Sequence, residues 1–271
     1  MVFFRQGIYE RPAYRQIPIR HFLELLRALV VRDFRSRYRR SILGPLWAAL
    51  QPIAYTAVFM LVRNVVEIDV GNDPYVLVAF IAMVPWLFFA NTMTRCSVSV
   101  HNNASVVKKM AMPREVFPTA AVCMSLIDMM ISALILGLLL LWFRTPVTTA
   151  FLWLPVLVLT VVALSGGVGL GLAALGTFKT DIAMGVPILL QLGLFATPVI
   201  YPLNSVDEGL MRQMMSLNPM AGIIEGFRTV LLHGQPPDSG LLLISWCGVL
   251  AVWIVCWPLF RYMSQYFADV L

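Results

Sequence analysis

The sequence predicts an all-α integral membrane protein with six transmembrane helices, an N-terminal amphipathic interfacial helix and a re-entrant helical hairpin before the last span. Three observations predict this fold. Apolar residues make up 59% of the 271 residues and charged residues only 13%, against roughly 25% charged residues in a soluble domain. Apolar runs of about 20 residues, long enough to cross a hydrocarbon core, recur along the chain. Basic residues gather in alternate connections between these runs.

Residues 1–42 are predicted to form a cytoplasmic N-terminal segment that contains the interfacial helix. Between positions 20 and 40 the apolar side chains recur at helical spacing on one side and the basic ones lie largely on the other, as in a helix lying in the membrane interface. Asp33 and Arg37 fall on the apolar side, where they either pair with each other or project toward a partner. The arginine cluster of this segment is Arg32, Arg35, Arg37, Arg39 and Arg40. Arginines beside a first span set topology and contact anionic headgroups.

The transmembrane domain is predicted to cover residues 43–271. Its six spans are residues 43–62, 75–93, 116–143, 151–175, 182–201 and 240–260. Of the 20 Lys and Arg residues, sixteen precede the first span or follow the second, fourth or sixth, and four lie in the other connections. The positive-inside rule therefore predicts a multi-pass protein with both termini in the cytoplasm.

The cytoplasmic connection of residues 94–115 combines charge with exposed apolar side chains. Its core, "NASVVKKMAMPREVFP", is short and basic, and two prolines bracket the entry into the third span. Such a segment suits docking into a groove on a soluble partner. Apolar side chains that snorkel at the membrane surface are the alternative.

The outer connection of residues 204–234 is predicted to form the helical hairpin. Asn218 stands at an N-cap position and Pro219 at the first helical position, and apolar residues follow at i, i+3 and i+4 spacing. We expect a helix-turn-helix that dips into the outer leaflet. An ordinary surface helix is the alternative.

Within the spans, Asp128 is the one ionisable residue near a midpoint, and two roles stay open for it. A carboxylate in lipid indicates function by default, whereas hydrogen bonds to neighbouring helices give it a structural role. Gly167 and Gly171 form a GxxxG pair that indicates close helix packing or a hinge. The candidate channel or hinge residues are Trp47, Gln51, Pro52, Trp86, Phe89, Asp128, Gly167 and Gly171.

The sequence offers no catalytic or metal-binding constellation. No GxxxxGK[ST] loop occurs, so we do not expect this chain to hydrolyse ATP by that route. The three histidines are scattered over both sides of the membrane and cannot converge as metal ligands or as a catalytic pair. We expect no enzyme activity, cofactor, metal or nucleic-acid partner for this chain.

Four stretches together resemble the membrane subunit of bacterial polysaccharide exporters of the type-2 ABC class. They are "RDFRSRYRRSILGPLWAALQP", "NASVVKKMAMPREVFP", "FATPVIYPL" and "LNPMAGIIEGFRTVLLHG". They appear in the order found in that family and extend over nearly the whole chain.

The resemblance implies a permease in the bacterial inner membrane, where two copies and two ATP-binding subunits export a lipid-linked, O-antigen-like polysaccharide. ATP and Mg²⁺ would bind to the partner ATPase. The residues that the resemblance assigns to ATPase coupling are Val106, Val107, Lys108, Lys109, Met110, Met112, Pro113, Arg114 and Glu115. Those assigned to the outer re-entrant hairpin include Asn218, Pro219, Glu225 and Arg228. The arginine cluster then either binds the diphosphate of the lipid carrier or serves topology and headgroup contact alone.

Two other classes are weighed against export by an ABC system. A secondary transporter predicts inverted repeats around coupling groups at the membrane midplane, but no repeat is visible and Asp128 is the sole midplane charge. An integral membrane enzyme of cell-envelope glycan assembly needs His, Asp or Glu groups that converge at one membrane face, and the sequence presents none.

Overall fold

The structure, a computed structural model, describes residues 18–39, 41–66, 73–110, 112–205 and 209–271, and these ranges contain helices and no strand. The longer helices are α1 (Ile19–Tyr38), α2 (Trp47–Val66), α3 (Tyr75–Ser99), α5 (Val116–Trp142), α6 (Leu154–Phe178), α7 (Thr180–Ala196) and α10 (Ser239–Ser264). The shorter ones are α4 (Ala104–Lys109), α8 (Leu210–Ser216), α9 (Pro219–Arg228) and α11 (Phe267–Val270). Turns of 3₁₀-helix cover Gly44–Leu46, His101–Asn103, Thr149–Trp153 and Leu203–Ser205, and one π-helical turn covers Thr229–His233.

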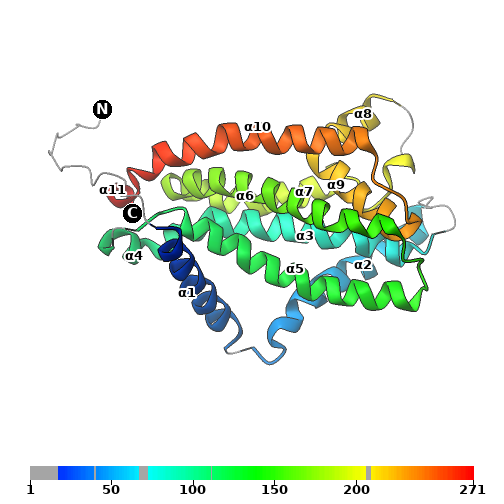
Figure 1. Cartoon of the computed structure of the whole chain (residues 1–271), viewed down its shortest axis with the longest axis horizontal. Helices are drawn as coiled ribbons and strands as arrows, with labels where there is room; N and C mark the ends of the chain where they lie inside the picture. The colour runs from blue at the N-terminus through cyan, green and yellow to red at the C-terminus, as the bar shows by residue number, and fades with distance from the viewer. Residues whose placement is uncertain (1–17, 40, 67–72, 111, 206–208) are drawn as a thin grey trace.

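The helices form an elongated bundle with distinct ends (Figure 1). The helices α4 and α11 and the start of α1 lie at one end, and α8 and α9 lie at the other. From its start, α1 runs obliquely along the flank of the bundle before the chain turns into α2. Segments that the sequence assigns to the cytoplasm therefore share one end, and the predicted hairpin occupies the opposite one.

Five helical stretches of the described residues are long and apolar enough to cross a membrane, and they confirm the predicted membrane character. They cover Gly44–Arg63, Tyr75–Ser99, Val116–Trp142, Thr149–Phe178 and Ser239–Ser264. The predicted fifth span is represented by α7, which has only 17 residues. Its predicted end at Tyr201 is wrong, since Thr197 already has extended dihedral angles. Pro198 explains the early end because proline disfavours helical geometry in the residue before it.

The centre of the bundle is filled by α3. Every residue from Leu77 to Phe88 is buried, and α3 contacts α2, α5, α6, α7 and α9. A helix that is apolar on all sides is covered either by protein or by lipid, and here the surrounding helices cover α3. The centre of the bundle formed by a single chain is therefore filled with packed side chains.

Glycines let α6 lie close to two helices at once. A Cβ atom added to Gly167 or Gly171 would lie 2.7 or 2.8 Å from side chains of α10. On the opposite face, a Cβ atom at Gly176 would lie 2.1 Å from the carbonyl oxygen of Ser97 in α3. The sequence predicts either close helix packing or a hinge for Gly167 and Gly171, and their contacts with α10 are those of close packing.

The apolar side of α1 packs on protein. Leu29 is buried in a cluster with Val116, Phe117 and Ala120 of α5, and its apolar neighbours on α1 pack against the same cluster. The predicted amphipathic helix is thus present, but its apolar face is covered at least partly by α5. The sequence pattern alone does not distinguish a protein surface from a lipid surface, because both are apolar.

The close approach of α6 to α3 yields a stability prediction. We expect Gly176→Ala to lower the free energy of unfolding by about 1–3 kcal/mol, because the backbone of α3 has to move away from the new methyl group. Gly137→Ala is the matched control, since its Cβ atom would meet nothing within 4 Å. Thermal unfolding of the detergent-purified variants measures both. Equal midpoints for the two variants would contradict the packing described for α6.

Candidate functional site

The predicted docking segment forms a small helix, α4, with one buried and one exposed side. Val107 is buried, whereas Lys108, Lys109 and Met110 are exposed. Met110 has 55% of its surface accessible although its side chain is apolar. The segment therefore presents positive charge beside an apolar contact, which is the combination predicted for a protein-docking surface. The other described members of the segment, Val106, Met112, Pro113, Arg114 and Glu115, are half-buried.

The connection from α4 into α5 also contacts the C-terminal helix α11. The guanidinium carbon of Arg114 lies 5.9 Å from the ring centroid of Phe267. Phe267 is fully buried and packs edge-on against Phe178 at the end of α6 and Phe260 of α10, with centroids 6.1 and 5.6 Å away. The docking segment is thus joined through one aromatic cluster to two of the long helices.

Asp128 accepts hydrogen bonds from two other helices. Its Oδ2 accepts from Nη1 of Arg37 in α1 at 2.9 Å and from Nη2 of Arg95 in α3. Its side chain is only 8% exposed, and an unpaired charge at such a site costs several kcal/mol. Of the two roles left open for Asp128, its contacts are those of the structural one, in which hydrogen bonds join it to neighbouring helices.

Tyr38 completes the coordination of this carboxylate. Its hydroxyl donates to Oδ1 of Asp128 at 2.9 Å, and burial together with this hydrogen bond raises the pKa of Tyr38 to about 12. The phenol stays protonated and acts as a donor at neutral pH. Of the two alternatives for Asp33 and Arg37, pairing with each other is wrong, because Asp33 pairs with Arg32 at 2.7 Å and Arg37 with Asp128.

Four residues beyond Asp128, Ser132 of α5 supports the start of α2. Pro52 lies inside α2 and has no N–H to donate to the carbonyl of Ala48, four residues earlier. The hydroxyl of Ser132 lies 3.0 Å from this carbonyl oxygen and 3.1 Å from that of Asp128, so its one O–H is shared between the two acceptors. The candidate hinge at Pro52 is therefore tied to α5 in this structure.

The structure separates the predicted arginine cluster into two groups. Arg32 and Arg37 line a pocket between α1, α3 and α5, together with Arg95. Arg35 and Arg39 are exposed and do not line it. Arg40 lies outside the described residues.

The remaining channel candidates do not gather at one site, and each has a different environment. Trp47 is 56% exposed at the start of α2. The side-chain oxygen of Gln51 accepts a hydrogen bond from Asn91 of α3 at 3.2 Å. Trp86 is buried, with Phe89 at a centroid distance of 6.0 Å and Gly193 of α7 against its ring. The indole of Trp86 therefore contributes to the α3–α7 contact within one chain.

The predicted start of the outer helix is confirmed. Asn218 caps α9 by accepting a hydrogen bond from the backbone N–H of Met220 at 3.0 Å, and Pro219 occupies the first turn. The side-chain amide of Asn218 donates to Thr197 at 3.0 Å. One residue thus starts α9 and also connects it to the chain that leaves α7.

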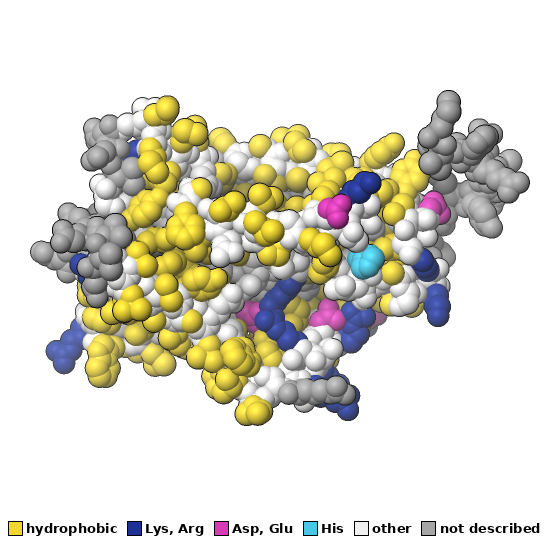
Figure 2. All heavy atoms as spheres, turned by 180° about the vertical axis from the view of Figure 1, so that it is seen from behind, with side chains coloured by type: hydrophobic (Ala, Val, Ile, Leu, Met, Phe, Trp, Pro, Cys, Tyr) yellow, Lys and Arg dark blue, Asp and Glu magenta, His cyan; other side chains and the backbone are white. Residues whose placement is uncertain are grey.

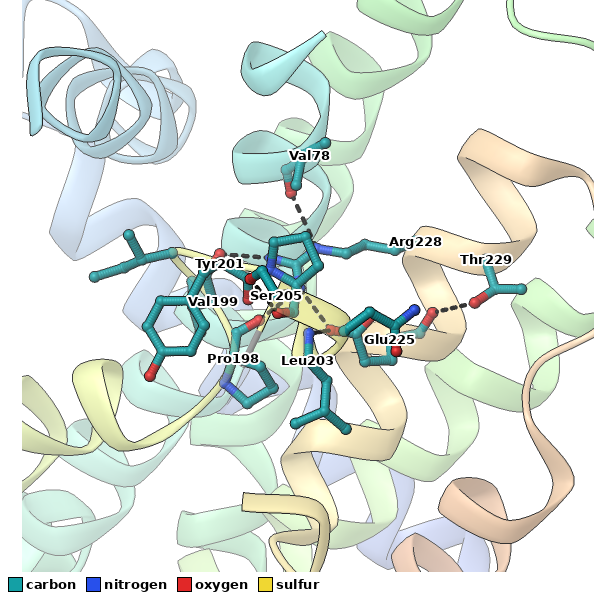
Figure 3. Close-up of polar contacts among 12 residues, drawn as sticks. Val78, Pro198, Val199, Tyr201, Leu203, Ser205, Glu225, Arg228 and Thr229 are labelled. Carbon is teal, nitrogen blue, oxygen red and sulfur yellow. Dashed lines mark hydrogen bonds and ion pairs between the residues drawn. The ribbon is translucent and has the colours of Figure 1, made fainter. Parts of the chain in front are cut away.

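Arg228 holds the irregular chain after α7 in place (Figure 3). Its side chain is only 3% exposed and pairs with Glu225 at 2.8 Å. The same guanidinium donates to the backbone carbonyls of Pro198 and Val199 at 2.7 and 2.6 Å. Because Pro198 ends the helix, these carbonyls have no helical partners, and a planar group with five donors can satisfy several of them.

Glu225 and α3 complete this outer cluster. The Oε1 atom of Glu225 also accepts from the backbone N–H of Leu203 at 2.8 Å. Nε of Arg228 donates to the carbonyl of Val78 in α3 at 3.3 Å. The Glu225–Arg228 pair therefore fixes α9, the chain around Leu203 and α3 to one another.

Sequence reasoning missed Arg95, Tyr38 and Ser132 as partners of the candidate residues. The apolar pattern places Arg95 in a connection because the predicted second span ends at residue 93, whereas α3 continues to Ser99. The one available signal was the buried-charge rule, which requires a cation for Asp128 without naming it. Among the described residues, no group of three His, Cys, Asp or Glu side chains is placed to hold a metal ion.

The Asp128 contacts predict a strong effect of removing its charge. We expect Asp128→Asn to lower the free energy of unfolding by on the order of 2–4 kcal/mol, because two guanidinium groups lose their counter-charge. We also expect faster tryptic cleavage at the exposed Arg35. Asp33→Asn is the control, since it removes a partly exposed pair worth about 0–1 kcal/mol. Equal stability of both variants would count against an anchoring role for Asp128.

The outer cluster makes a second prediction. Arg228→Lys keeps the charge beside Glu225 but loses the planar fork, so several buried carbonyls lose their donors. We expect an unfolding free energy lower by on the order of 3 kcal/mol. Arg144→Lys, at an exposed arginine two residues after α5, is expected to change it by less than about 0.5 kcal/mol. Unfolding of both variants in detergent measures the difference, and no difference between them would refute the role of the guanidinium fork.

Comparisons with known proteins find relatives that match most of this chain. An O-antigen export system permease protein RfbA of Myxococcus xanthus is 28% identical over 248 residues, which are 90% of this chain and 94% of that protein. An O-antigen export system permease protein RfbA of Klebsiella pneumoniae is 22% identical over 253 residues, 93% of this chain and 96% of that protein. The polysialic acid transport protein KpsM of Escherichia coli is 24% identical over 211 residues, 76% of this chain and 81% of that protein.

The family model of ABC-2 type transporters matches residues 24–232. This range contains α4, the Asp128 cluster and the Glu225–Arg228 pair, and it covers well over half of the chain. The chain therefore belongs to the ABC-2 type transporter family.

Proposed function

We propose that this chain is the permease subunit of an ABC exporter that moves a lipid-linked polysaccharide out of the cytoplasm across the bacterial inner membrane. The proposal is supported by the names of the relatives, which are O-antigen and polysialic acid export proteins. The single observation that carries it is the exposed α4 segment, which lies within the residues that match the ABC-2 family and is joined through Arg114 and Phe267 to long apolar helices. The chain acts as a transport subunit and performs no chemistry of its own.

In the proposed topology both termini are cytoplasmic and six helices cross the membrane. The gathering of α1, α4 and α11 at one end of the bundle supports this orientation (Figure 1). We assign α7 as the short fifth span because it begins beside Phe178 in the α11 cluster and is followed by Thr197, which contacts the cap of α9. The hairpin of α8 and α9 then dips into the outer leaflet before α10 returns.

The proposed partner at the cytoplasmic end is an ATP-binding subunit, which carries ATP and Mg²⁺. Lys108 and Lys109 at the end of α4 and Met110 directly after it are exposed and supply the contact surface. A displacement of this segment is transmitted through Arg114 and Phe267 to α6 and α10, since these residues pack in one cluster. No cofactor is required on the permease itself.

A second copy of the chain is the other proposed partner, in an assembly of two permeases and two ATPase subunits. A polysaccharide needs a hydrated conduit, because its many hydroxyl groups are costly to bury without partners. The centre of one bundle is filled by the buried residues of α3 from Leu77 to Phe88. We therefore place the conduit between two copies, and movement of the two chains relative to each other opens it.

The two groups of arginines are assigned different roles. Arg35 and Arg39 are exposed and serve topology and contact with lipid headgroups. Arg32 and Arg37 line the pocket beside α5 and are the members of the cluster available for a diphosphate.

Complementation tests the proposal. In a strain that lacks the gene, surface polysaccharide is lost and finished glycan accumulates inside the cell, and the wild-type chain restores export. We expect Lys108→Glu with Lys109→Glu to restore less than about a tenth of it, because the positive docking surface is reversed. Lys179→Glu, at an exposed lysine at the α6–α7 junction, is the control and restores export.

Immunoblots of surface glycan and co-purification of the ATP-binding subunit are the measurements. Normal surface glycan in the deletion strain, with no second exporter present, refutes the function.

A further inference from the structure

A pocket of about 440 Å³ lies between α1, the end of α3 and the first half of α5. Figure 2 shows basic and acidic side chains in a hollow on this face, above the lobe formed by the α1–α2 connection and between hydrophobic surfaces. The volume is sufficient for a small headgroup. The pocket lies at the flank of the bundle, away from the packed core around α3.

One wall of the pocket is strongly cationic. Arg32 and Arg37 come from α1 and Arg95 from α3, and Asp33 is the single carboxylate among the lining residues. Asp128 lies behind this wall and is 8% exposed. The two carboxylates together balance two of the three guanidinium charges, so the pocket keeps a net positive charge that favours an anion.

The arginines are held in position while donors stay available. Within the described residues Arg37 makes one hydrogen bond, from Nη1 to Asp128, although its guanidinium group carries five N–H donors. Arg95 donates to Ser125 at 3.2 Å and to Asp128. Side chains already fixed by a carboxylate lose little further freedom on binding a ligand, which makes planar recognition of phosphate oxygens favourable.

Amide groups and an apolar wall complete the pocket. Asn102 and Asn103 line it beside Arg32, and Asn103 accepts a hydrogen bond from Arg32 at 2.7 Å. The opposite side is formed by Phe117 and Met124 of α5 and by a few other apolar residues. A wholly hydrated anion does not use an apolar wall, whereas an amphipathic ligand uses both surfaces.

We propose that this pocket binds the phosphate or diphosphate group of a lipid-linked ligand, with Arg32, Arg37 and Arg95 as donors. The inference rests on the proposed function and assigns one set of residues to it. Arg95 joins the site, whereas Arg35 and Arg39 do not. Asp128 is a positioning residue that holds two of the guanidinium groups. The phosphate belongs either to the lipid carrier of the exported glycan or to a membrane phospholipid.

The test measures binding to the purified complex of this chain and its ATP-binding subunit in phosphatidylcholine nanodiscs. The probe is farnesyl diphosphate, and farnesol is the uncharged control. We expect farnesyl diphosphate to bind and farnesol to bind at least about tenfold more weakly. Arg37→Gln removes a donor and Ala121→Phe fills the pocket without changing a charge, and each is expected to weaken binding about tenfold or more. Arg27→Gln is the matched control, at an exposed arginine of α1 that does not line the pocket.

The outcomes separate the inference from the proposed function. Arg32→Gln provides a second charge variant if Arg37→Gln does not fold. Displacement of farnesyl diphosphate by phosphatidylglycerol at equal concentration supports the phosphate site and assigns it to bilayer lipid, whereas no displacement assigns it to the lipid carrier. Equal binding of farnesol, or unchanged binding in both Arg37→Gln and Ala121→Phe, overturns the inference. If the wild-type chain nevertheless restores glycan export in the deletion strain, the proposed function stands without this site.

Discussion

The buried carboxylate of Asp128 is the interaction on which the arrangement of the first two helices depends. A charge inside a membrane helix requires partners, and here they come from Arg37 and Tyr38 of α1 and from Arg95 of α3. One turn further along α5, the hydroxyl of Ser132 lies 3.0 Å from the carbonyl of Ala48, which Pro52 leaves without a backbone donor. One face of α5 thus fixes the end of α1 and the start of α2, and this determines where the cationic pocket lies.

The opposite end of the bundle uses the same physical solution. Arg228 is buried with Glu225 and donates to the backbone carbonyls that lack helical partners after the end of α7 at Pro198. Between these two charged clusters the structure is apolar and tightly packed, with α3 at the centre and glycines bringing α6 against it. Movement during transport is therefore expected between rigid bodies, around the buried charge clusters and along the surfaces shared with a second copy and with the ATP-binding subunit.

Most of the helical elements could be predicted from the sequence, whereas most of their partners could not. The length of an apolar run and the Asn218-Pro219 cap are set by residues adjacent in the sequence, so the spans and the start of α9 can be recognised from it. The pairing of Asp128 with Arg37 joins residues 91 positions apart, and no local pattern encodes such a contact. Helical spacing allows the Asp33–Arg37 pair, but the buried carboxylate of Asp128 is the stronger partner for Arg37. Apolar length extends the fifth span to Tyr201, but Pro198 ends the helix earlier.

A double-mutant cycle between Asp128 and Arg37 tests the central claim most directly. The free energy of unfolding in SDS–detergent mixtures is measured for the wild-type chain, Asp128→Asn, Arg37→Gln and the double variant. The account predicts a coupling energy of at least about 1 kcal/mol, because either single change already removes the Arg37–Asp128 contact. Additive effects within about 0.3 kcal/mol would contradict the claim that Asp128 anchors α1 to α5.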